Sequence, residues 1–390
     1  MQIPGLDAYK EKWGIGSRSV IEPGLERMER VLAELGNPEQ HDKIVHVAGT
    51  NGKGSTIAFM KAICESHGVT YGAFQSPAIL DVHDQITING QNATEVQLDS
   101  AMRRIAETKD ADSLTDFELL TICAFLIFNE SNVEIWLIET GMGGRYDSTN
   151  VIPQSIAIIT SLAIEHTNFL GESLEEIGEH KAGILKQDSD VFLPEDIYLP
   201  PFEREADMKN ARLFRMRPLT EDIELSLLGE HQRMNATLAS TALSQYLQLD
   251  DTLLRSGLKK AFIPFRMEKI TENIYLDGAH NPAAAKALVE TIQAQFSNEK
   301  IHFVMGILKD KDFEEVLRTY ETVANKFTFV DFSYERALKS NRLVELCRIQ
   351  NVSCKHISEI DINLLNNDNY RSFITGSLYF LSEWKLKNRI

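Results

Sequence analysis

A glycine-rich segment near the N-terminus constrains this chain more than any other stretch. Residues 45–55 read VHVAGTNGKGS, in which β-branched residues precede three glycines, a lysine and a serine. The pattern predicts a buried parallel strand, a tight turn and a helix that begins at Ser55. Backbone N–H groups of such a turn bind phosphate, Lys53 adds a positive charge, and Ser55 can ligate Mg²⁺. A turn that only joins strand to helix is the alternative reading.

The turn departs from the general phosphate-loop pattern G-x-x-x-x-G-K-[ST] at two places. Val47 occupies the position of the first glycine, and Gly54 stands between Lys53 and Ser55. The variant G-T-N-G-K-G-S resembles the phosphate loop of the folylpolyglutamate synthase/dihydrofolate synthase family, which is related to the Mur ligases of peptidoglycan synthesis. The resemblance implies that ATP is bound by Gly49, Thr50, Asn51, Gly52, Lys53, Gly54 and Ser55.

Composition limits the classes of partner. The chain has 390 residues, enough for about two to three domains, and its 57 acidic against 40 basic residues leave a net charge of −17. Such a field repels nucleic acid, so we expect no nucleic-acid partner. The four cysteines show no metal-binding spacing and sit among apolar residues, which indicates reduced core thiols. Neither a signal peptide nor a membrane-length apolar run is visible, so we expect a cytoplasmic protein without a membrane partner.

A candidate metal site follows two further apolar runs. Residues 134–139 (EIWLIE) predict a buried strand that ends in Glu139, where a carboxylate beside a phosphate loop can bind Mg²⁺. Residues 155–160 predict another strand, which leads to His166. A solvated strand end and a structural histidine are the alternatives. The segments ETGMGGRYDSTN and LAIEHTNFLG resemble family motifs, with Glu165 in place of the usual aspartate. The resemblance implies a metal site of Ser55, Ser76, Glu139 and His166, holding Mg²⁺ or, given the histidine, Mn²⁺.

The loop that carries Ser76 reads QSPAILDVHDQITING over residues 75–90. It resembles the family's long substrate loop at its start and at its end. Ala78 replaces the usual histidine, and Asp84 with Gln85 replaces the usual Glu-Arg pair. We therefore carry over only the metal role of Ser76.

Residues 114–118, LTDFE, predict the start of a helix, with Thr115 as N-cap and Glu118 at the capping-box position. A purely structural role is the alternative. The family has a similar motif near the folate site, and an aspartate after its glycine-rich turn. The resemblance therefore implies that Thr115, Phe117 and Asp147 contact the folate or pterin.

Lys181 lies in HKAGILK, within a helix predicted from Ser173 to Lys186 with Ser173 as N-cap and Glu176 three residues on. A lysine in such a helix is usually a solvated surface charge. The resemblance implies instead that CO₂ carbamylates Lys181, so that it helps to hold a metal. Lys53, Lys181 and His166 are the catalytic residues implied in this way.

A second α/β pattern begins after residue 262. Residues 187–228 carry little signal, and residues 229–247 predict a helix that contains Asn235. Residues 262–269 (FIPFRMEK) predict a linker, in which Phe265 replaces a family glycine. Strands then alternate with helices, starting at DGAHNP. The resemblance implies that four residues of these motifs contact ATP: Asn235, Arg266, Asp277 and His280.

Taken together, these patterns predict a two-domain α/β protein. Residues 1–262 form a P-loop-containing parallel-sheet ATPase domain that also binds folate, and residues 263–390 a smaller Rossmann-like glutamate ligase domain. The resemblance implies a monomeric ligase that uses ATP to add L-glutamate to dihydropteroate or to reduced folates, and we expect both acceptors to be used. Three alternatives stay open: a polyglutamate synthase only, a Mur-type amino-acid ligase, and a non-catalytic nucleotide-binding paralogue.

Overall fold

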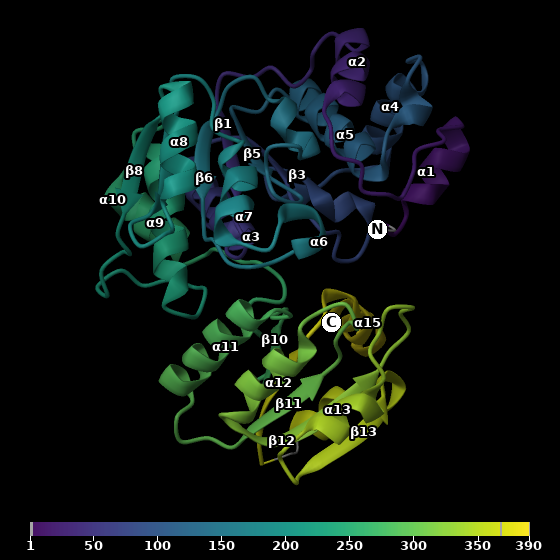
Figure 1. The fold of residues 1–390 in the computed structure, drawn as a ribbon, viewed down its shortest axis with the longest axis vertical. Coiled ribbons are helices and arrows are strands. Elements are labelled where there is room, and N and C mark those ends of the chain that lie inside the picture. Colours follow the sequence, from purple (N-terminus) through teal and green to yellow (C-terminus); the bar gives the residue numbers. More distant parts are fainter. Residues whose placement is uncertain (1–2, 367–368, 390) are drawn as a thin grey trace. The chain divides into compact units, whose positions relative to one another are not determined.

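The computed structural model describes residues 3–366 and 369–389, which pack into two compact units (Figure 1). Unit 1 extends to Ser226 and resumes from Gln232 to Phe262. Unit 2 takes Leu227–His231 and continues from Ile263. Each unit has its own sheet, so each is described separately.

The sheet of unit 1 has eight strands in the order β4-β3-β2-β5-β1-β6-β7-β8. The six strands from β2 to β8 run parallel, and β3 and β4 add an antiparallel hairpin at one edge. The strands are β1 (Ile44–Ala48), β2 (Tyr71–Phe74), β3 (Ile86–Ile88), β4 (Gln91–Asn92), β5 (Ile135–Glu139), β6 (Ile156–Ile159), β7 (Asp190–Pro194) and β8 (Arg212–Met216).

Helices cover both faces of this sheet. The central strand β1 is therefore buried at every residue. Ile44 packs with α1, α2, α4 and α5 in one apolar cluster, and Ala48 packs with α7 and α8 in another. The helices of unit 1 are α1 (Leu6–Trp13), α2 (Glu26–Glu34), α3 (Lys53–His67), α4 (Glu95–Ala106), α5 (Asp116–Ser131), α6 (Thr167–Leu170), α7 (Leu174–Ala182), α8 (Pro200–Lys209), α9 (His231–Ser244) and α10 (Asp251–Leu258). The first residue of α9, His231, belongs to unit 2. Three short 3₁₀ turns are η1 (Val82–Gln85), η2 (Ala111–Ser113) and η3 (Ser148–Val151).

Unit 2 is a second α/β layer structure with the strand order β13-β12-β11-β14-β10-β9, parallel except for β9. Its core is rich in aromatic residues from β11, β12 and β14. Its elements are β9 (Glu268–Lys269), β10 (Ile274–Asp277), α11 (Pro282–Gln295), β11 (Ile301–Met305), α12 (Phe313–Glu321), β12 (Ala324–Asp331), α13 (Ser340–Leu346), β13 (Val352–His356), η4 (Ile357–Glu359), α14 (Ile362–Asn366), β14 (Arg371–Thr375) and α15 (Leu378–Asn388).

The predicted fold class is confirmed: a parallel-sheet α/β unit with a phosphate loop is joined to a smaller α/β unit. Some local predictions are wrong. Helix α3 begins at Lys53, two residues earlier than expected, because Gly52 caps it with a φ of 93°. Residues 187–228, predicted to carry little, contain β7, α8 and β8. The last of these is an edge strand, and its exposed residues Arg212 and Arg215 interrupt the apolar pattern that would reveal it.

The cysteine prediction is half right. Cys64 and Cys123 are buried, and burial raises the pKa of the Cys64 thiol to about 12. Cys347 is only half-buried and Cys354 is exposed, so neither is a core thiol. All four are free. Within the described residues, no helix is both long and apolar enough to cross a bilayer.

Candidate functional site

The phosphate loop lies between β1 and α3, and two of its glycines leave no room for a side chain. A Cβ on Gly49 would come within 1.9 Å of Thr160 Oγ1, and one on Gly52 within 2.6 Å of Asn235 Oδ1. Both residues also have a positive φ, which favours glycine. The loop is therefore wrapped closely onto its neighbours.

Hydrogen bonds fix the loop to the segment that follows β6. Thr50 N–H donates to Ser161 O at 3.1 Å, and Thr50 Oγ1 to Ala163 O at 3.1 Å. Asn51 N–H donates to Ser161 Oγ at 2.9 Å, and Thr160 Oγ1 donates to Asn51 O at 2.7 Å. Hydrogen bonds within the chain therefore hold both sides of the loop.

Lys53 and Ser55 lie in the first turn of α3. Lys53 Nζ donates to Gly49 O at 2.7 Å, so its ammonium group bends back over the loop. Ser55 is buried and lies 3.4 Å from Gln232 Nε2. Gln232 Oε1 accepts from Asn235 Nδ2 at 2.9 Å, so Gln232 and Asn235 support the loop from α9. A contact of Asn235 with nucleotide stays a prediction.

The predicted metal ligands follow four adjacent strands. In the order β2-β5-β1-β6, Ser76 follows β2, Glu139 ends β5, Ser55 follows β1 and His166 follows β6. Glu139 is 5% exposed and pairs in register with Val47, directly before the phosphate loop. His166 is exposed and is the N-cap residue of α6, with a φ of 48°. Strand ends at one edge of a parallel sheet are where such folds bind ligands.

These donors suit one kind of metal site. Among the residues that the structure describes, no group of three or more His, Cys, Asp or Glu side chains could hold a metal alone. Mg²⁺ is usually bound by one or two protein oxygens together with water and substrate phosphates. Glu139 and Ser55 offer a carboxylate and a hydroxyl beside the phosphate loop, so the donor set fits Mg²⁺ bound jointly by protein and nucleotide.

Lys181 is not a surface charge, because its side chain on α7 is only 1% exposed. Its Nζ donates to Glu165 Oε1 at 2.9 Å. Burial lowers the pKa of Lys181 to about 8, and the charge of Lys53 acts in the same direction. Burial alone would raise the pKa of Glu165, but Lys181 and Lys53 hold it below its ordinary value. Lys53, Lys181 and Glu165 thus form one charge cluster beside the loop.

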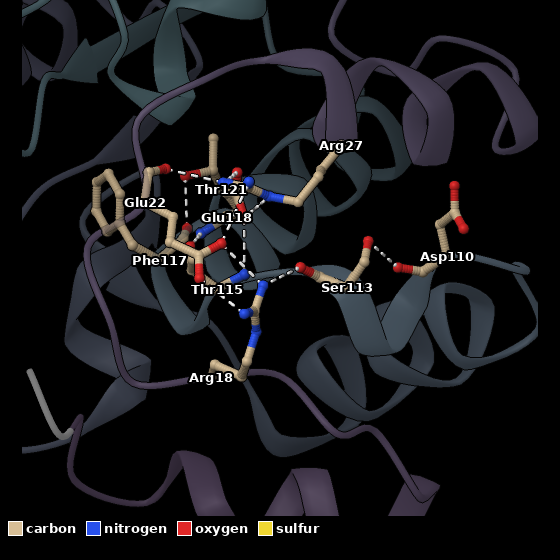
Figure 2. Close-up of polar contacts among 9 residues, drawn as sticks. All are labelled: Arg18, Glu22, Arg27, Asp110, Ser113, Thr115, Phe117, Glu118 and Thr121. Carbon is tan, nitrogen blue, oxygen red and sulfur yellow. Dashed lines mark hydrogen bonds and ion pairs between the residues drawn. The ribbon is translucent and has the colours of Figure 1, made fainter.

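Thr115 and Glu118 form the predicted capping box at the start of α5 (Figure 2). Thr115 N–H donates to Glu118 Oε2 at 2.7 Å, and Glu118 N–H donates to Thr115 Oγ1 at 3.3 Å. The buried Glu118 carboxylate also pairs with Arg27 at 3.0 Å. Arg18 forms a parallel bridge with Thr115, so residues 18–27 are tied to the first turn of α5. The capping prediction for Thr115 is confirmed, and its contact with pterin stays a prediction.

Phe117 and Asp147 meet at Gly141, in the turn after β5. A Cβ on Gly141 would lie 2.6 Å from Phe117 Cζ and 3.2 Å from Asp147 Oδ2. Phe117 stacks on Phe74, with the ring centroids 5.6 Å apart. Burial raises the pKa of Asp147, and hydrogen bonds from Thr149 and neighbouring backbone N–H groups oppose this shift. An aromatic face and a buried carboxylate are therefore side by side.

Arg266, Asp277 and His280 lie together in unit 2. Asp277 ends β10 and accepts from Met267 N–H at 2.9 Å. Burial raises its pKa, which the charge of Arg266 opposes. His280 Nδ1 donates to Gly278 O at 2.8 Å, and a Cβ on Gly278 would lie 2.9 Å from Arg266 Nη1. Gly278 thus leaves room for the guanidinium.

The chain matches two family models and many known proteins. The Mur ligase middle domain matches residues 47–196, and the Mur ligase, glutamate ligase domain matches residues 265–364. The dihydrofolate synthase/folylpolyglutamate synthase of Bacillus subtilis (strain 168) is 36% identical, over 93% of this chain and 94% of the relative. The chain belongs to the folylpolyglutamate synthase/dihydrofolate synthase family. It is therefore an ATP-dependent ligase.

Solved structures of this family have the same fold. The Escherichia coli FolC enzyme in complex with DHPP and ADP superposes with a TM-score of 0.87 at 26% identity, covering 97% of this chain and 96% of that one. The bifunctional enzyme of Yersinia pestis, complexed with AMPPNP and Mn ion, superposes with a TM-score of 0.87 at 27% identity, covering 98% and 97%. The family match and the fold agree over nearly the whole chain.

The loop of residues 75–90 is held by hydrogen bonds at the positions where it departs from the family pattern. The Asp84 carboxylate accepts from the backbone N–H groups of Ile79 and Asp81, at 3.0 and 3.3 Å. Gln85 is buried, and its Nε2 donates to Gln75 O at 3.3 Å. The Asp-Gln pair therefore closes this loop where the family pattern has Glu-Arg.

Phe265 occupies a family glycine position with a φ of 59°, where a side chain costs about 1–2 kcal/mol. Its ring is nonetheless fully buried. We expect Phe265→Ala to lose about 3–5 kcal/mol of stability, because the ring is lost while the backbone strain remains. Phe265→Gly should lose about 1 kcal/mol less, because it removes that strain as well. Thermal unfolding of both variants measures the difference.

Phe303 provides the control for this comparison. It is equally buried, but it lies within β11, where glycine is the poorer residue. Phe303→Gly should therefore be less stable than Phe303→Ala, the reverse of the order at Phe265. The same order at both positions would show that Phe265 is not strained.

Sequence reasoning missed several residues that shape this site. They are Thr160, Ser161 and Ala163, which hold the phosphate loop; Gln232, which reaches Ser55; and Arg27, which pairs with Glu118. The hydroxyl pair Thr160-Ser161 directly after β6 was the one local signal available. The other contacts join segments roughly 90 to 180 residues apart, so no short pattern reveals them.

Proposed function

We propose that this enzyme adds L-glutamate to both dihydropteroate and reduced folate, using ATP. The observation that carries the proposal is the convergence at the ends of two adjacent strands. The phosphate loop follows β1, Glu139 ends β5, and Asp147 lies in the turn after β5, where Phe117 of α5 contacts the same glycine, Gly141. Relatives solved with ADP, AMPPNP, Mn ion, DHPP and L-glutamate support a site for these ligands.

The reaction has two steps. A carboxylate oxygen of the folate acceptor attacks the γ-phosphorus of ATP, the bond to the β-phosphate oxygen breaks, and an acyl phosphate and ADP form. The amino group of glutamate then attacks the acyl carbon, a C–N bond forms, and inorganic phosphate leaves. Lys53 and the N–H groups of the loop hold the charge that develops on the transferred phosphoryl group.

The remaining roles are assigned as follows. Mg²⁺, or Mn²⁺, bound by Ser55, Ser76, Glu139 and His166, would neutralise phosphate charge. Beyond the loop Gly49–Ser55, the nucleotide contacts proposed are Asn235, Arg266, Asp277 and His280. In this assignment residues 1–262 bind ATP and folate, and residues 263–390 supply the glutamate ligase part. We place the enzyme in the cytoplasm as a monomer.

Thr115, Phe117 and Asp147 are proposed to bind the pterin of the acceptor. The Phe117 ring offers a stacking face, and the Asp147 carboxylate accepts hydrogen bonds from ring N–H groups. A buried carboxylate discriminates strongly, because an acceptor without matching donors leaves it unsatisfied.

The acceptor assay tests this function directly. Purified enzyme with ATP and glutamate should release ADP with dihydropteroate and, separately, with tetrahydrofolate. Asp147→Ala should impair dihydropteroate use by at least about tenfold more than tetrahydrofolate use, because Asp147 matches a family position near the shorter acceptor. ADP release with tetrahydrofolate alone would identify a polyglutamate synthase only. Release with neither acceptor would contradict the proposal.

We propose further that Lys181 is carbamylated. The neutral amine attacks CO₂, an N–C bond forms and a proton is released, which leaves a carboxylate near the phosphate loop. Burial of Lys181 and the positive charge of the nearby Lys53 support the assignment, because both favour the neutral amine, although the Glu165 carboxylate acts in the opposite direction.

Carbamylation predicts a dependence on dissolved CO₂. Removal of CO₂ should lower wild-type activity by about tenfold, and bicarbonate should restore it. Lys181→Ala should be impaired and insensitive to bicarbonate. A carbamate signal from ¹³CO₂ that is present in the wild type and absent in the variant completes the test. Wild-type activity that is unchanged without CO₂ would refute it.

A further inference from the structure

A buried hydrogen-bond chain links the middle of β1 to the turn after β5. His46 Nε2 lies 2.8 Å from Thr149 Oγ1, and Thr149 Oγ1 lies 2.6 Å from Asp147 Oδ1. His46 and Thr149 are fully buried, and Asp147 is 6% exposed. The reaction described above uses neither His46 nor Thr149.

The partners fix the proton positions along this chain. Asp147 accepts from Met142 N–H at 2.8 Å and from Thr149 N–H at 3.1 Å, as an ionised carboxylate does. The Thr149 hydroxyl therefore donates to Asp147, and its oxygen accepts from His46 Nε2–H. His46 is then neutral, with Nδ1 bare. Within the described chain Nδ1 has no hydrogen-bond partner, and burial holds the pKa of His46 well below its ordinary value.

We propose that His46 and Thr149 are positioning residues for acceptor recognition, which hold the Asp147 carboxylate in the orientation that accepts hydrogen bonds from a pterin. This inference rests on the proposed contact between Asp147 and the pterin. Every hydrogen-bond donor in the His46–Thr149–Asp147 chain points toward Asp147. The Asp147 carboxylate therefore offers only lone pairs to the pterin. The adjacent residue, Val47, pairs with Glu139, so one strand supports the phosphate loop, the metal site and the acceptor carboxylate together.

Two pairs of variants test the two links. Thr149→Val keeps the shape of the side chain but loses the hydroxyl, whereas Thr149→Ser keeps the hydroxyl. His46→Leu loses the donor, whereas the amide of His46→Gln can replace it. We expect Thr149→Val and His46→Leu to raise the KM for the pterin acceptor by about tenfold or more, with the KM for ATP within about twofold. The Ser and Gln variants should stay within about threefold of wild type.

A similar pair in unit 2 separates recognition from stability. His302 Nε2 lies 2.9 Å from Thr328 Oγ1, and both residues are buried. Thr328→Val should lower the thermal midpoint about as much as Thr149→Val. It should leave the KM for the acceptor unchanged. An equal rise in acceptor KM from Thr328→Val would overturn the proposal, because general loosening would then explain both.

The variant Asp147→Asn distinguishes the possible failures. If it leaves the KM for the acceptor unchanged, the proposed contact of Asp147 with pterin is wrong. If it raises that KM, Thr149→Val should add little in its background, because Thr149 acts through Asp147. If the effects of Asp147→Asn and Thr149→Val on the acceptor KM multiply, the positioning role is refuted. Equal acceptor KM values for Thr149→Val and Thr149→Ser would refute it too. Neither result would contradict the contact of Asp147 with pterin. If Thr149→Val does not fold, the His46 pair decides by the same criteria.

Discussion

Replacing Lys53 with alanine should lower kcat by at least about 100-fold, equivalent to ~2.7 kcal/mol of lost transition-state stabilisation. The ammonium group bends over the loop toward Gly49 O, where it can meet a phosphoryl group without a large rearrangement. The loop itself should survive, because hydrogen bonds to residues 161 and 163 hold it. Steady-state ADP release with saturating ATP, acceptor and glutamate measures the loss.

Lys61 is the matched control for this variant. It lies about two turns further along α3 and is half-buried like Lys53, but away from the loop. Lys61→Ala should keep kcat within about twofold of wild type. A folded Lys53→Ala enzyme with near-normal turnover would remove Lys53 from the catalytic site.

The variant Glu139→Gln should raise the Mg²⁺ concentration needed for half-maximal activity by at least about tenfold, and lower kcat by about 100-fold. A neutral amide keeps the shape of the side chain, but it is a poorer ligand for a hard cation than a carboxylate. The in-register pairing of Glu139 with Val47 places this charge beside the phosphate loop. Titration of activity with Mg²⁺ at saturating ATP gives both quantities.

Glu134 provides the control, because it precedes the opposite end of the same strand, where it accepts a hydrogen bond from Thr70 Oγ1 at 3.2 Å. Glu134→Gln should leave the Mg²⁺ requirement unchanged. If the two variants show the same Mg²⁺ dependence, Glu139 is not a metal ligand.

The parts of the fold that could be predicted depend on short-range physics. Thr115 with Glu118, and Ser173 with Glu176, form capping boxes, and both were predictable because the partners lie three residues apart. The buried strands β1, β5 and β6 were recognisable from apolar runs, because a strand covered on both faces needs apolar residues throughout.

The parts that could not be predicted depend on contacts made only in the folded chain. Burial of Lys181 against Glu165 needs α7 to pack beside the phosphate loop, and the HKAGILK motif read alone favours a surface lysine. The strand β8 exposes arginines at an edge of the sheet, so it has no apolar period to detect. Cys354 is exposed because it lies on the edge strand β13, and its neighbours Ser353 and Lys355 are polar.

Unit 2 is built from two separate pieces of chain, and this limits how the protein can be divided into fragments. Leu228, from the short piece Leu227–His231, packs against the core of unit 2. A gene fragment that starts at Ile263 would lack this residue and leave part of an aromatic core open to water. Exchange of this unit between relatives therefore requires three junctions, one on each side of residues 227–231 and one near Phe262, to transplant an intact hydrophobic interior.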